Sequence, residues 1–331
     1  MTASTAPRIT LGGTIQSALT HFCGFGLAAV LEEVGVPDVH VWWSDTVPPR
    51  LIVSGASEEE VDGIVRNHAA SATSSDHWLQ ARLSVGPRQG IALFSPRVKG
   101  ADSREEWNRY LEEREAALDA QRGALDQDLI AALGSPAHWR ETAKARNPDA
   151  GASRWDMTPR NGGREMVSQR FAPLAAAVAG RASGEVVDGI TGRALRDETA
   201  SKEWRTPSGF TQPQPTDSAV AWLALWGISW FPLAQSTTRV AVTPGAHPSR
   251  VTHPTMMALP IFTSPTRPAL WRTVLRSQQF ATAIDQESVV ARRELRECGV
   301  VGIGCFPIRK AGSASAPERI VLDGRLDVFQ R

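Results

Sequence analysis

The sequence DSAVAWLALWGISWF, residues 217–231, is the most hydrophobic stretch of the chain. Asp217 or Ser218 can cap a helix here, and apolar residues surround the axis of that helix on all sides. A helix of this kind is buried, so we expect the core to form around it. Its tryptophans repeat every four residues, at Trp222, Trp226 and Trp230. We interpret them as core packing rather than as a platform for a ligand.

The segments before this helix alternate between helix and strand signals. The sequence ITLGGTIQSALTHFCGFGLAAVLEEVG, residues 9–35, predicts a short strand and then a helix that ends at the final glycine. Strands are predicted at Val39–Trp43 and Arg50–Ser54. Ser57 with Glu60 forms a capping box, which starts another helix.

The segments after residue 231 mix the two kinds of element in the same way. Strands are predicted near Arg239–Thr243, Ala258–Phe262, Val300–Ile308 and Arg319–Leu322, and helices near Pro268–Ser277 and Asp285–Cys298. Because there is no regular βαβ alternation, we expect an α+β fold, with mixed helices and short, mostly antiparallel strands in an irregular architecture.

The chain divides into four expected regions. They are an N-terminal α+β region (1–100), a helical region with an Arg/Gly turn (101–180), an exposed irregular loop (181–216) and a C-terminal α+β region (217–331). In the second region Ser103 and Glu106 form a capping box that starts the longest helix, which we expect to run to about Leu133. The loop has turn residues throughout and no apolar period, so we expect it to be exposed or disordered.

The overall composition is that of a globular protein. Of the 331 residues, 42% are hydrophobic and 21% are charged, which is close to the average for chains with a packed core. No run approaches the roughly 18 apolar residues of a membrane helix, and the N-terminus has no basic segment followed by an apolar one. We therefore expect a cytoplasmic protein with no membrane partner, whose three cysteines are reduced thiols.

Positive charge is supplied almost entirely by arginine, because the chain has only four lysines. Arginine binds phosphate bidentately and stacks on bases, although a GC-rich genome that favours arginine codons is the simpler explanation. The net charge of +1 conceals an asymmetry: residues 101–134 have nine acids and four arginines, whereas residues 201–315 have twelve bases and six acids. Separated charges of this kind predict docking surfaces of opposite character.

The common catalytic signatures are missing from the sequence. It contains no GxxxxGK[ST] phosphate loop, no GxSxG nucleophile turn and no HExxH zinc motif. Gly24-Phe-Gly26 lacks the third glycine of a dinucleotide motif, and the spacings of cysteine and histidine do not suit zinc. We therefore predict no catalytic residue, no metal and no cofactor, while a site assembled from distant residues stays open.

The strongest candidate site is RWDMTPRNGGR, residues 154–164. Two glycines directly before a predicted helix allow the backbone to approach a ligand closely, and the start of that helix presents N–H groups to an anion. We predict that the arginines contact phosphates and that Asn161 contacts a base edge. The candidate residues are Arg154, Arg160, Asn161, Gly162, Gly163, Arg164 and Arg170. An equally weighted alternative is a tight turn whose arginines pair with Asp149, Asp156 and Glu165.

A second basic group lies on the last predicted helices. Its candidate nucleic-acid contacts are Arg292, Arg293 and Arg296, which lie within four positions of one another and so share a helical face. The alternative is a solvated face whose charge is balanced by Glu294 and Glu297.

Three stretches of the chain together resemble one protein family. HFCGFGLAAVLEEVG (21–35), with the strand VHVWW (39–43), resembles the start of the large subunits of type I CRISPR effector complexes, known as Cascade. DMTPRNGGRE (156–165) resembles the Arg/Gly turn of the variant I-U/I-G large subunits. AWLALWGISWFPLA (221–234), with TMMALPIFTSPTRPALW (255–271), resembles their late hydrophobic helix and strand. The quoted residues make up 61 of the 331 positions of the chain.

This resemblance implies a non-catalytic subunit of an RNA-guided complex that acts in antiviral defence. In this family the large subunit recognises the short motif (PAM) that flanks the target, helps to open the duplex and recruits a separate helicase-nuclease, while the guide RNA pairs with the rest. The implied partners are the other Cascade subunits, the CRISPR RNA, target double-stranded DNA and the helicase-nuclease. Roles carry over only to the turn, where Arg160, Asn161 and Arg164 would face DNA.

Two other classes of function stay open on the sequence alone. One is an enzyme of an unrecognised family with a composite site that uses His21, His77 or Asp156. The other is an interaction or scaffold protein that docks through the acidic 103–133 helix and the 181–216 loop.

Overall fold

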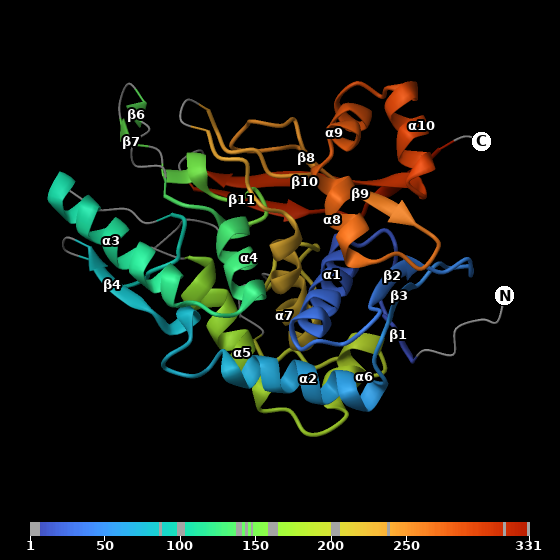
Figure 1. Ribbon diagram of the computed structural model, residues 1–331, viewed down its shortest axis with the longest axis horizontal. Coiled ribbons are helices and arrows are strands. Elements are labelled where there is room, and N and C mark those ends of the chain that lie inside the picture. Colours follow the sequence, from blue (N-terminus) through green and yellow to red (C-terminus); the bar gives the residue numbers. More distant parts are fainter. Residues whose placement is uncertain are drawn as a thin grey trace.

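The computed structural model describes residues 7–85, 88–97, 103–136, 141–142, 145–146, 148–157, 165–199, 206–236, 239–313 and 316–329, which we call the described residues. Helices and strands are mixed along the chain, and the expected α+β class is confirmed (Figure 1). A long hairpin of strands crosses one side of the molecule, and helices fill the centre and the opposite side.

The helices have the following bounds among the described residues. The α-helices are α1 (Ala18–Glu33), α2 (Glu58–Ser71), α3 (Arg104–Ala120), α4 (Ala124–Leu133), α5 (Ala172–Ala179), α6 (Glu185–Thr191), α7 (Ser218–Trp226), α8 (Pro268–Arg276), α9 (Gln278–Asp285) and α10 (Val289–Glu297). The 3-10 helices are η1 (Trp78–Gln80), η2 (Pro148–Gly151) and η5 (Gly227–Trp230), and η4 (Val167–Phe171) is a π-helix.

The strands form two sheets and two separate hairpins among the described residues. One sheet has the order β1 (Arg8–Thr10), β3 (Leu51–Ser54) and β2 (His40–Trp43). The other has the order β11 (Ala316–Val321), β10 (Val300–Ser313), β9 (Met256–Phe262) and β8 (Ala246–His247), and β12 (Arg325–Val328) also pairs with β10. The hairpins are β4 (Arg82–Val85) with β5 (Arg88–Ala92), and β6 (Glu141–Thr142) with β7 (Ala145–Arg146). Every strand pairing between described residues is antiparallel.

The centre of the molecule is the contact between α1 and α7, which lie side by side (Figure 1). A Cβ atom on Gly26 would lie 1.8 Å from the carbonyl oxygen of Leu223, and one on Gly227 would lie 2.2 Å from a carbonyl oxygen of α1. The two helix backbones therefore touch directly. A Cβ atom on Gly24 would lie 2.2 Å from Leu51 Cδ2, so α1 also packs closely against β3. The pattern Gly24-Phe-Gly26 is thus a packing motif.

The tryptophans of α7 and η5 are core residues, as their spacing predicts. Trp222, Trp226 and Trp230 are each at most 1% exposed. The His68 ring of α2 lies 4.5 Å from the ring of Trp226, and Phe25 of α1 stacks on Trp230 at 4.5 Å between centroids. Aromatic rings from separate elements therefore fill the space around the central helix.

The N-terminal and C-terminal parts of the chain are joined through β2. The N–H of Val41 donates to Thr266 O at 2.8 Å, and Trp271 Nε1 donates to Val41 O at 3.0 Å. Trp271 is fully buried, and its ring lies 4.6 Å from that of Phe262 in β9. One continuous cluster of buried apolar side chains contains residues of the N-terminal, helical and C-terminal regions expected from the sequence. These regions therefore share one core.

The long helix expected from Ser103 to Leu133 is wrong in one respect. Ser103 Oγ accepts the N–H of Glu106 at 3.1 Å, so the helix starts where its cap predicts. Gln121 is extended, however, and Gly123 begins a second helix, α4. The change of direction buries one apolar side of α4, including Leu133, in the core.

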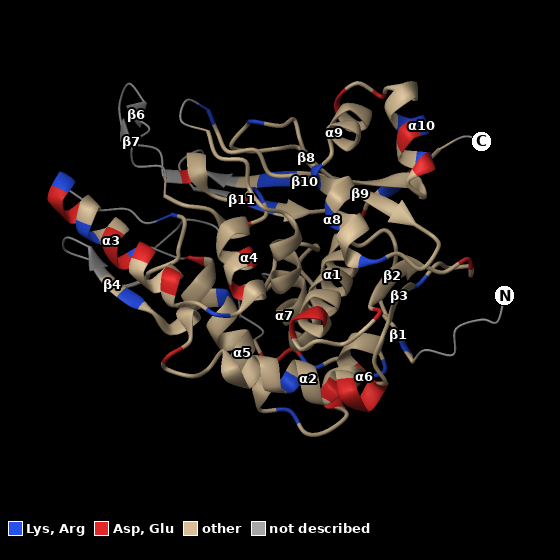
Figure 2. Ribbon diagram, viewed as in Figure 1, with Lys and Arg blue, Asp and Glu red and all other residues tan. Residues whose placement is uncertain are grey.

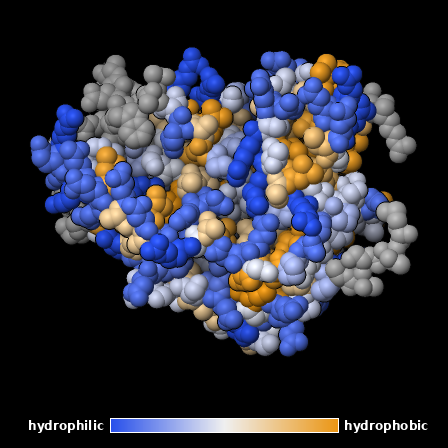
Figure 3. All heavy atoms as spheres, viewed as in Figure 1, coloured by the Kyte–Doolittle hydropathy of each residue, from blue (hydrophilic) through white to orange (hydrophobic). Residues whose placement is uncertain are grey.

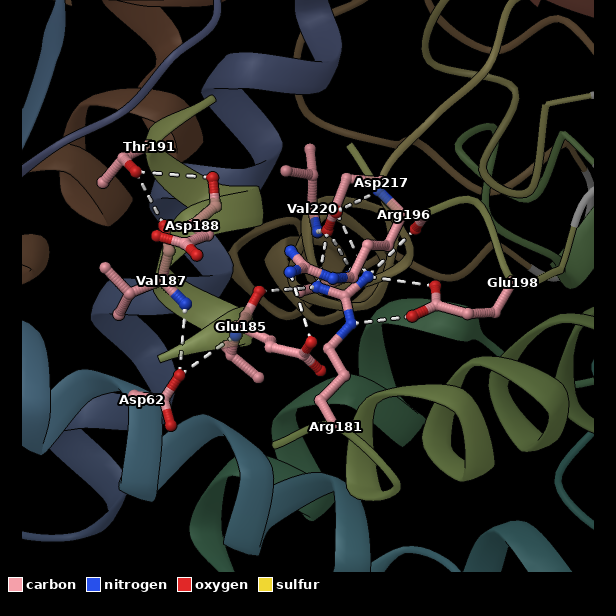
Figure 4. Close-up of polar contacts among 12 residues, drawn as sticks. Asp62, Arg181, Glu185, Val187, Asp188, Thr191, Arg196, Glu198, Asp217 and Val220 are labelled. Carbon is pink, nitrogen blue, oxygen red and sulfur yellow. Dashed lines mark hydrogen bonds and ion pairs between the residues drawn. The ribbon is translucent and has the colours of Figure 1, made fainter. Parts of the chain in front are cut away.

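The segment 181–216 is not an exposed irregular loop where the structure describes it. It contains α6, and Phe210 is buried. Arg181 Nη1 and Nη2 donate to the two carboxylate oxygens of Asp217 at 3.0 and 3.1 Å, and Arg181 Nε donates to Glu198 at 2.9 Å (Figure 4). Asp217 also caps α7 by accepting the N–H of Ala219. One carboxylate therefore ties this segment to the core helix.

The first turn of α6 is capped by a side chain of α2. Asp62 Oδ1 accepts the N–H groups of Val186 and Val187 at 3.0 and 3.3 Å, and Asp62 is buried (Figure 4). Because the residue before α6, Gly184, has no side chain to supply a cap, this carboxylate satisfies the first N–H groups of the helix.

Smaller differences from the sequence-based expectation lie in the C-terminal region. In place of a strand at Arg239–Thr243, an isolated bridge joins Ala234 to Val242. The helix expected at Asp285–Cys298 starts at Val289, and Asp285 is instead the last residue of α9. Strand β12 was not expected.

Replacing Gly26 by alanine tests the direct contact of α1 with α7. The new methyl group would overlap the backbone of Leu223, so we expect the free energy of unfolding to fall by about 3 kcal/mol or more. The control is Gly63→Ala in α2, where a Cβ meets nothing within 4 Å, and a gain of about 0.5–1 kcal/mol is expected. Chemical denaturation measures both, and equal stability of the two variants would contradict the contact.

Stability should also fall below neutral pH. Burial lowers the pKa of His21 to about 4 and that of His68 to about 3. The folded protein therefore keeps both rings neutral where the unfolded chain takes up protons, so the stability is complete above about pH 6.5 and is lost as the pH falls toward 4. Urea denaturation at pH 7 and pH 5 should show a loss of up to about 1.4 kcal/mol per histidine per pH unit. His68→Leu should flatten this profile, and an unchanged profile would refute the assignment.

Candidate nucleic-acid interface

The glycine-rich part of the candidate turn, residues 158–164, lies outside the described residues. The predicted roles of Arg160, Asn161, Gly162, Gly163 and Arg164 therefore stay predictions. The chain on both sides of it is buried. Trp155, Asp156 and Met157 precede it and Met166 and Val167 follow it, all at most 3% exposed. The described chain on both sides of the segment therefore lies in the interior of the protein.

Arg154 is an interior residue, which corrects its prediction as a phosphate contact. Its side chain is buried, and Nη1 donates to Thr252 O at 2.9 Å. Nη2 donates to the carbonyl oxygens of Asp149 and Ala152. Burial, together with repulsion from Arg97, lowers the pKa of Arg154 to about 9. All of these partners lie within the fold, so the guanidinium fixes the backbone before the turn and is not available to a nucleic acid.

Ion pairs with Arg97 also hold the backbone before the turn. Arg97 Nε lies 3.1 Å from Asp156 Oδ2 and 3.9 Å from Asp149 Oδ1, and Arg97 Nη2 donates to Asp156 O at 2.6 Å. Both carboxylates are buried. Two of the three acids that could pair with arginines of the turn, Asp149 and Asp156, therefore have an arginine partner from another part of the chain. Arg97 is 59 residues from Asp156, so no local sequence pattern indicates this contact.

The β10–β11 hairpin also binds the backbone before the turn, and it adds a basic side chain. Arg319 Nη1 donates to Arg154 O at 3.0 Å, and Arg319 Nη2 donates to Asp156 O. Lys310 lies directly opposite Arg319 in the strand pairing, so the two side chains project from the same face of the hairpin. Lys310 is exposed. Figure 2 shows basic residues on this hairpin and acidic ones on α3. Lys310 is a candidate that the sequence analysis missed.

The first residues after the turn have structural roles. Glu165 accepts the N–H of Val167 at 2.8 Å and the N–H of Ser168 at 2.5 Å, which caps the helical segment that follows. Burial raises the pKa of Glu165. Arg170 lies in η4, is half-buried and has an interaction partner. Its predicted nucleic-acid contact has no support in this placement.

The basic group on α10 is divided between two environments. Arg292 Nη2 donates to Asp327 Oδ2 at 2.7 Å, and its guanidinium lies 5.7 Å from the centre of the Phe329 ring. Arg293 and Arg296 are exposed, and Arg296 has an interaction partner. The three arginines do not form one uniform face, because Arg292 is turned toward β12.

The residues of a composite active site fall into separate surroundings. The buried His21 ring contacts the rings of Trp43 and Phe306. His77 Nε2 lies 3.6 Å from Asp126 Oδ1, and Asp156 pairs with Arg97. No contact between described residues joins His21, His77 and Asp156 to one another.

A scan against protein-family models and a search of curated proteins find no match to the chain. Within the described ranges, no helix is long and apolar enough to cross a membrane. The same ranges contain no group of three His, Cys, Asp or Glu side chains placed to hold a metal ion.

Substituting Asp156 tests the buried arginine network that precedes the turn. Asp156→Ala leaves the buried guanidinium groups of Arg97 and Arg154 without this carboxylate, so we expect a loss of about 3–5 kcal/mol in the free energy of unfolding. The control is Glu58→Ala, which removes an exposed pair with Arg193 at 2.8 Å and should cost at most about 1 kcal/mol. Chemical denaturation compares the two, and similar losses would show that the network does not hold the turn.

Proposed function

We propose that this chain is a non-catalytic subunit of an RNA-guided CRISPR interference complex that binds nucleic acid through residues 158–164. One observation carries the proposal: the chain before this segment is fixed by a buried arginine network, the chain after it is buried at Met166 and Val167, and the exposed Lys310 lies beside that network. The segment itself, TPRNGGR, has two arginines and no acid.

The chemistry of the segment suits a phosphate backbone. Arg160 and Arg164 supply guanidinium groups, which bind phosphate oxygens bidentately. Glycines at positions 162 and 163 let the backbone come close to a strand. Because the flanks are held in the interior, little conformational entropy of the flanking chain remains to be lost on binding. Lys310 extends the positive charge onto the hairpin.

The modest overall charge of the chain agrees with a role inside a larger assembly. A net charge of +1 supplies little long-range attraction to DNA, so partner subunits would share the phosphate contacts. The guide RNA would read the target by base pairing, which leaves the protein with the short flanking motif. Asn161 is the side chain of the segment that pairs with a base edge. Recruitment of a helicase-nuclease belongs to the same proposal.

The acidic surface of α3 supports docking to a basic partner subunit. This helix lies at the edge of the molecule, and hydrophilic residues cover it on the face shown in Figure 3. Its buried side chains, Tyr110 and Arg114, face the core, while most of its acids are exposed. We assign α3 to contacts within the complex rather than to DNA.

The test is reconstitution with the other Cascade subunits and a CRISPR RNA, followed by binding of target duplex. Arg160→Ala with Arg164→Ala should leave assembly on size-exclusion chromatography unchanged and weaken duplex binding about tenfold or more at physiological salt. The matched control is Arg109→Ala with Arg122→Ala, which removes the same charge from exposed positions near α3.

Two results would contradict the proposal. One is a complex that forms without this chain and binds duplex equally well. The other is an equal loss of binding in the two double variants, because that would trace the effect to total charge and not to the turn.

A further inference from the structure

A cavity of about 400 Å³ opens at the start of α1. It lies between the loop that leads into α1, the end of α6 and the start of α7. Its polar lining includes Gly13, Thr14, Ser17, Thr20, Asp217 and Asp323. Asp217 and Val220 of this wall appear in Figure 4. The volume is within the range of about 300–1,000 Å³ typical of small-molecule sites.

A buried hydroxyl in this cavity has no partner. Thr20 is 5% exposed and lines the cavity, and its Oγ1 makes no hydrogen bond with any described residue. The hydroxyl lies directly against Gly13, since a Cβ there would lie 1.9 Å from Thr20 Oγ1. The hydroxyl is therefore available to a ligand that enters the cavity.

The start of α1 adds further donors on the same side. Ser17 precedes the helix, but its side chain makes no capping hydrogen bond, so the first N–H groups of this 16-residue helix lack a side-chain acceptor. The positive end of the helix dipole also favours an anion at this place.

In the loop before α1, two more backbone N–H groups have no acceptor among the described residues. Arg50 Nη1 donates to Gly12 O at 2.6 Å and to Gly13 O at 3.3 Å. In a trans peptide the C=O and the following N–H point in opposite directions. The N–H groups of Gly13 and Thr14 therefore point away from Arg50, which does not line the cavity, and they donate to no described residue.

The carboxylates of the lining do not oppose an anion strongly. Asp217 is paired with Arg181, which binds both of its oxygens and also binds Glu198, and Asp217 accepts the N–H of Arg196 at 2.9 Å. Asp323 is exposed at the rim, where water screens its charge. We infer that this cavity binds the anionic group, a phosphate monoester or a carboxylate, of a small molecule, with the hydroxyl of Thr20 and the N–H groups at the start of α1 as its donors.

Calorimetric titration of the full chain with inorganic phosphate, adenosine 5′-monophosphate and acetate tests this inference. Binding of either phosphate compound without acetate assigns a phosphate site, binding of acetate alone assigns a carboxylate site, and binding of both classes supports a general anion site. Failure of all three to bind overturns the inference.

Two variants separate the site from non-specific binding. Thr20→Val keeps the shape of the side chain and removes only an unpartnered hydroxyl, so the unfolding midpoint should stay unchanged or rise while affinity falls about tenfold. Asp323→Asn removes a rim charge and should strengthen binding of the anion about two- to fivefold. Unchanged affinity of Thr20→Val, or weaker binding by Asp323→Asn, would contradict the inference, the latter because it indicates a cationic ligand.

Discussion

The contact of the α1 and α7 backbones at Gly26 and Gly227 is the constraint on which the rest of the structure depends. No side chain separates the two helices there, so their distance is fixed by main-chain atoms rather than by adjustable rotamers. On its other side, α1 packs against β3 through Gly24, and the tryptophans of α7 and η5 fill the surrounding core. The start of both helices is consequently fixed, and the cavity at Thr20 lies between them.

Buried arginines are the second constraint, because they fix segments of the chain to the core. Arg181 joins the 181–199 stretch to the cap of α7, and Arg97, Arg154 and Arg319 hold the backbone that leads into residues 158–164. In both places the guanidinium groups bind carboxylates or carbonyl oxygens inside the fold, which is how the interior accommodates charged arginine side chains. The arginines that matter for a nucleic acid are then those outside these networks, and the proposal rests on the segment that the second network supports.

The elements that follow from local signals were predictable, and those that depend on distant contacts were not. The buried helix with its Asp217 cap and the capping box at Ser57 were foreseen because pattern and cap lie within a few residues. The order in 181–216 was missed because it comes from Arg181, which reaches Asp217 across 36 positions. At the candidate interface, the arginine pattern drew attention to the turn, but sequence cannot tell a buried guanidinium such as Arg154 from an exposed one. Lys310 was overlooked because only strand register brings it beside Arg319, which binds the backbone before the turn.

Site-specific photo-crosslinking tests the central claim, that residues 158–164 contact nucleic acid, most directly. A photoreactive amino acid would replace Thr158, at the start of the segment, or Glu105, on the exposed acidic side of α3, in the chain assembled with its partner subunits, CRISPR RNA and labelled target DNA. The account predicts a covalent adduct with DNA or RNA from position 158 and only protein adducts from position 105. Protein adducts alone from position 158, in a complex that still binds its target, would contradict it.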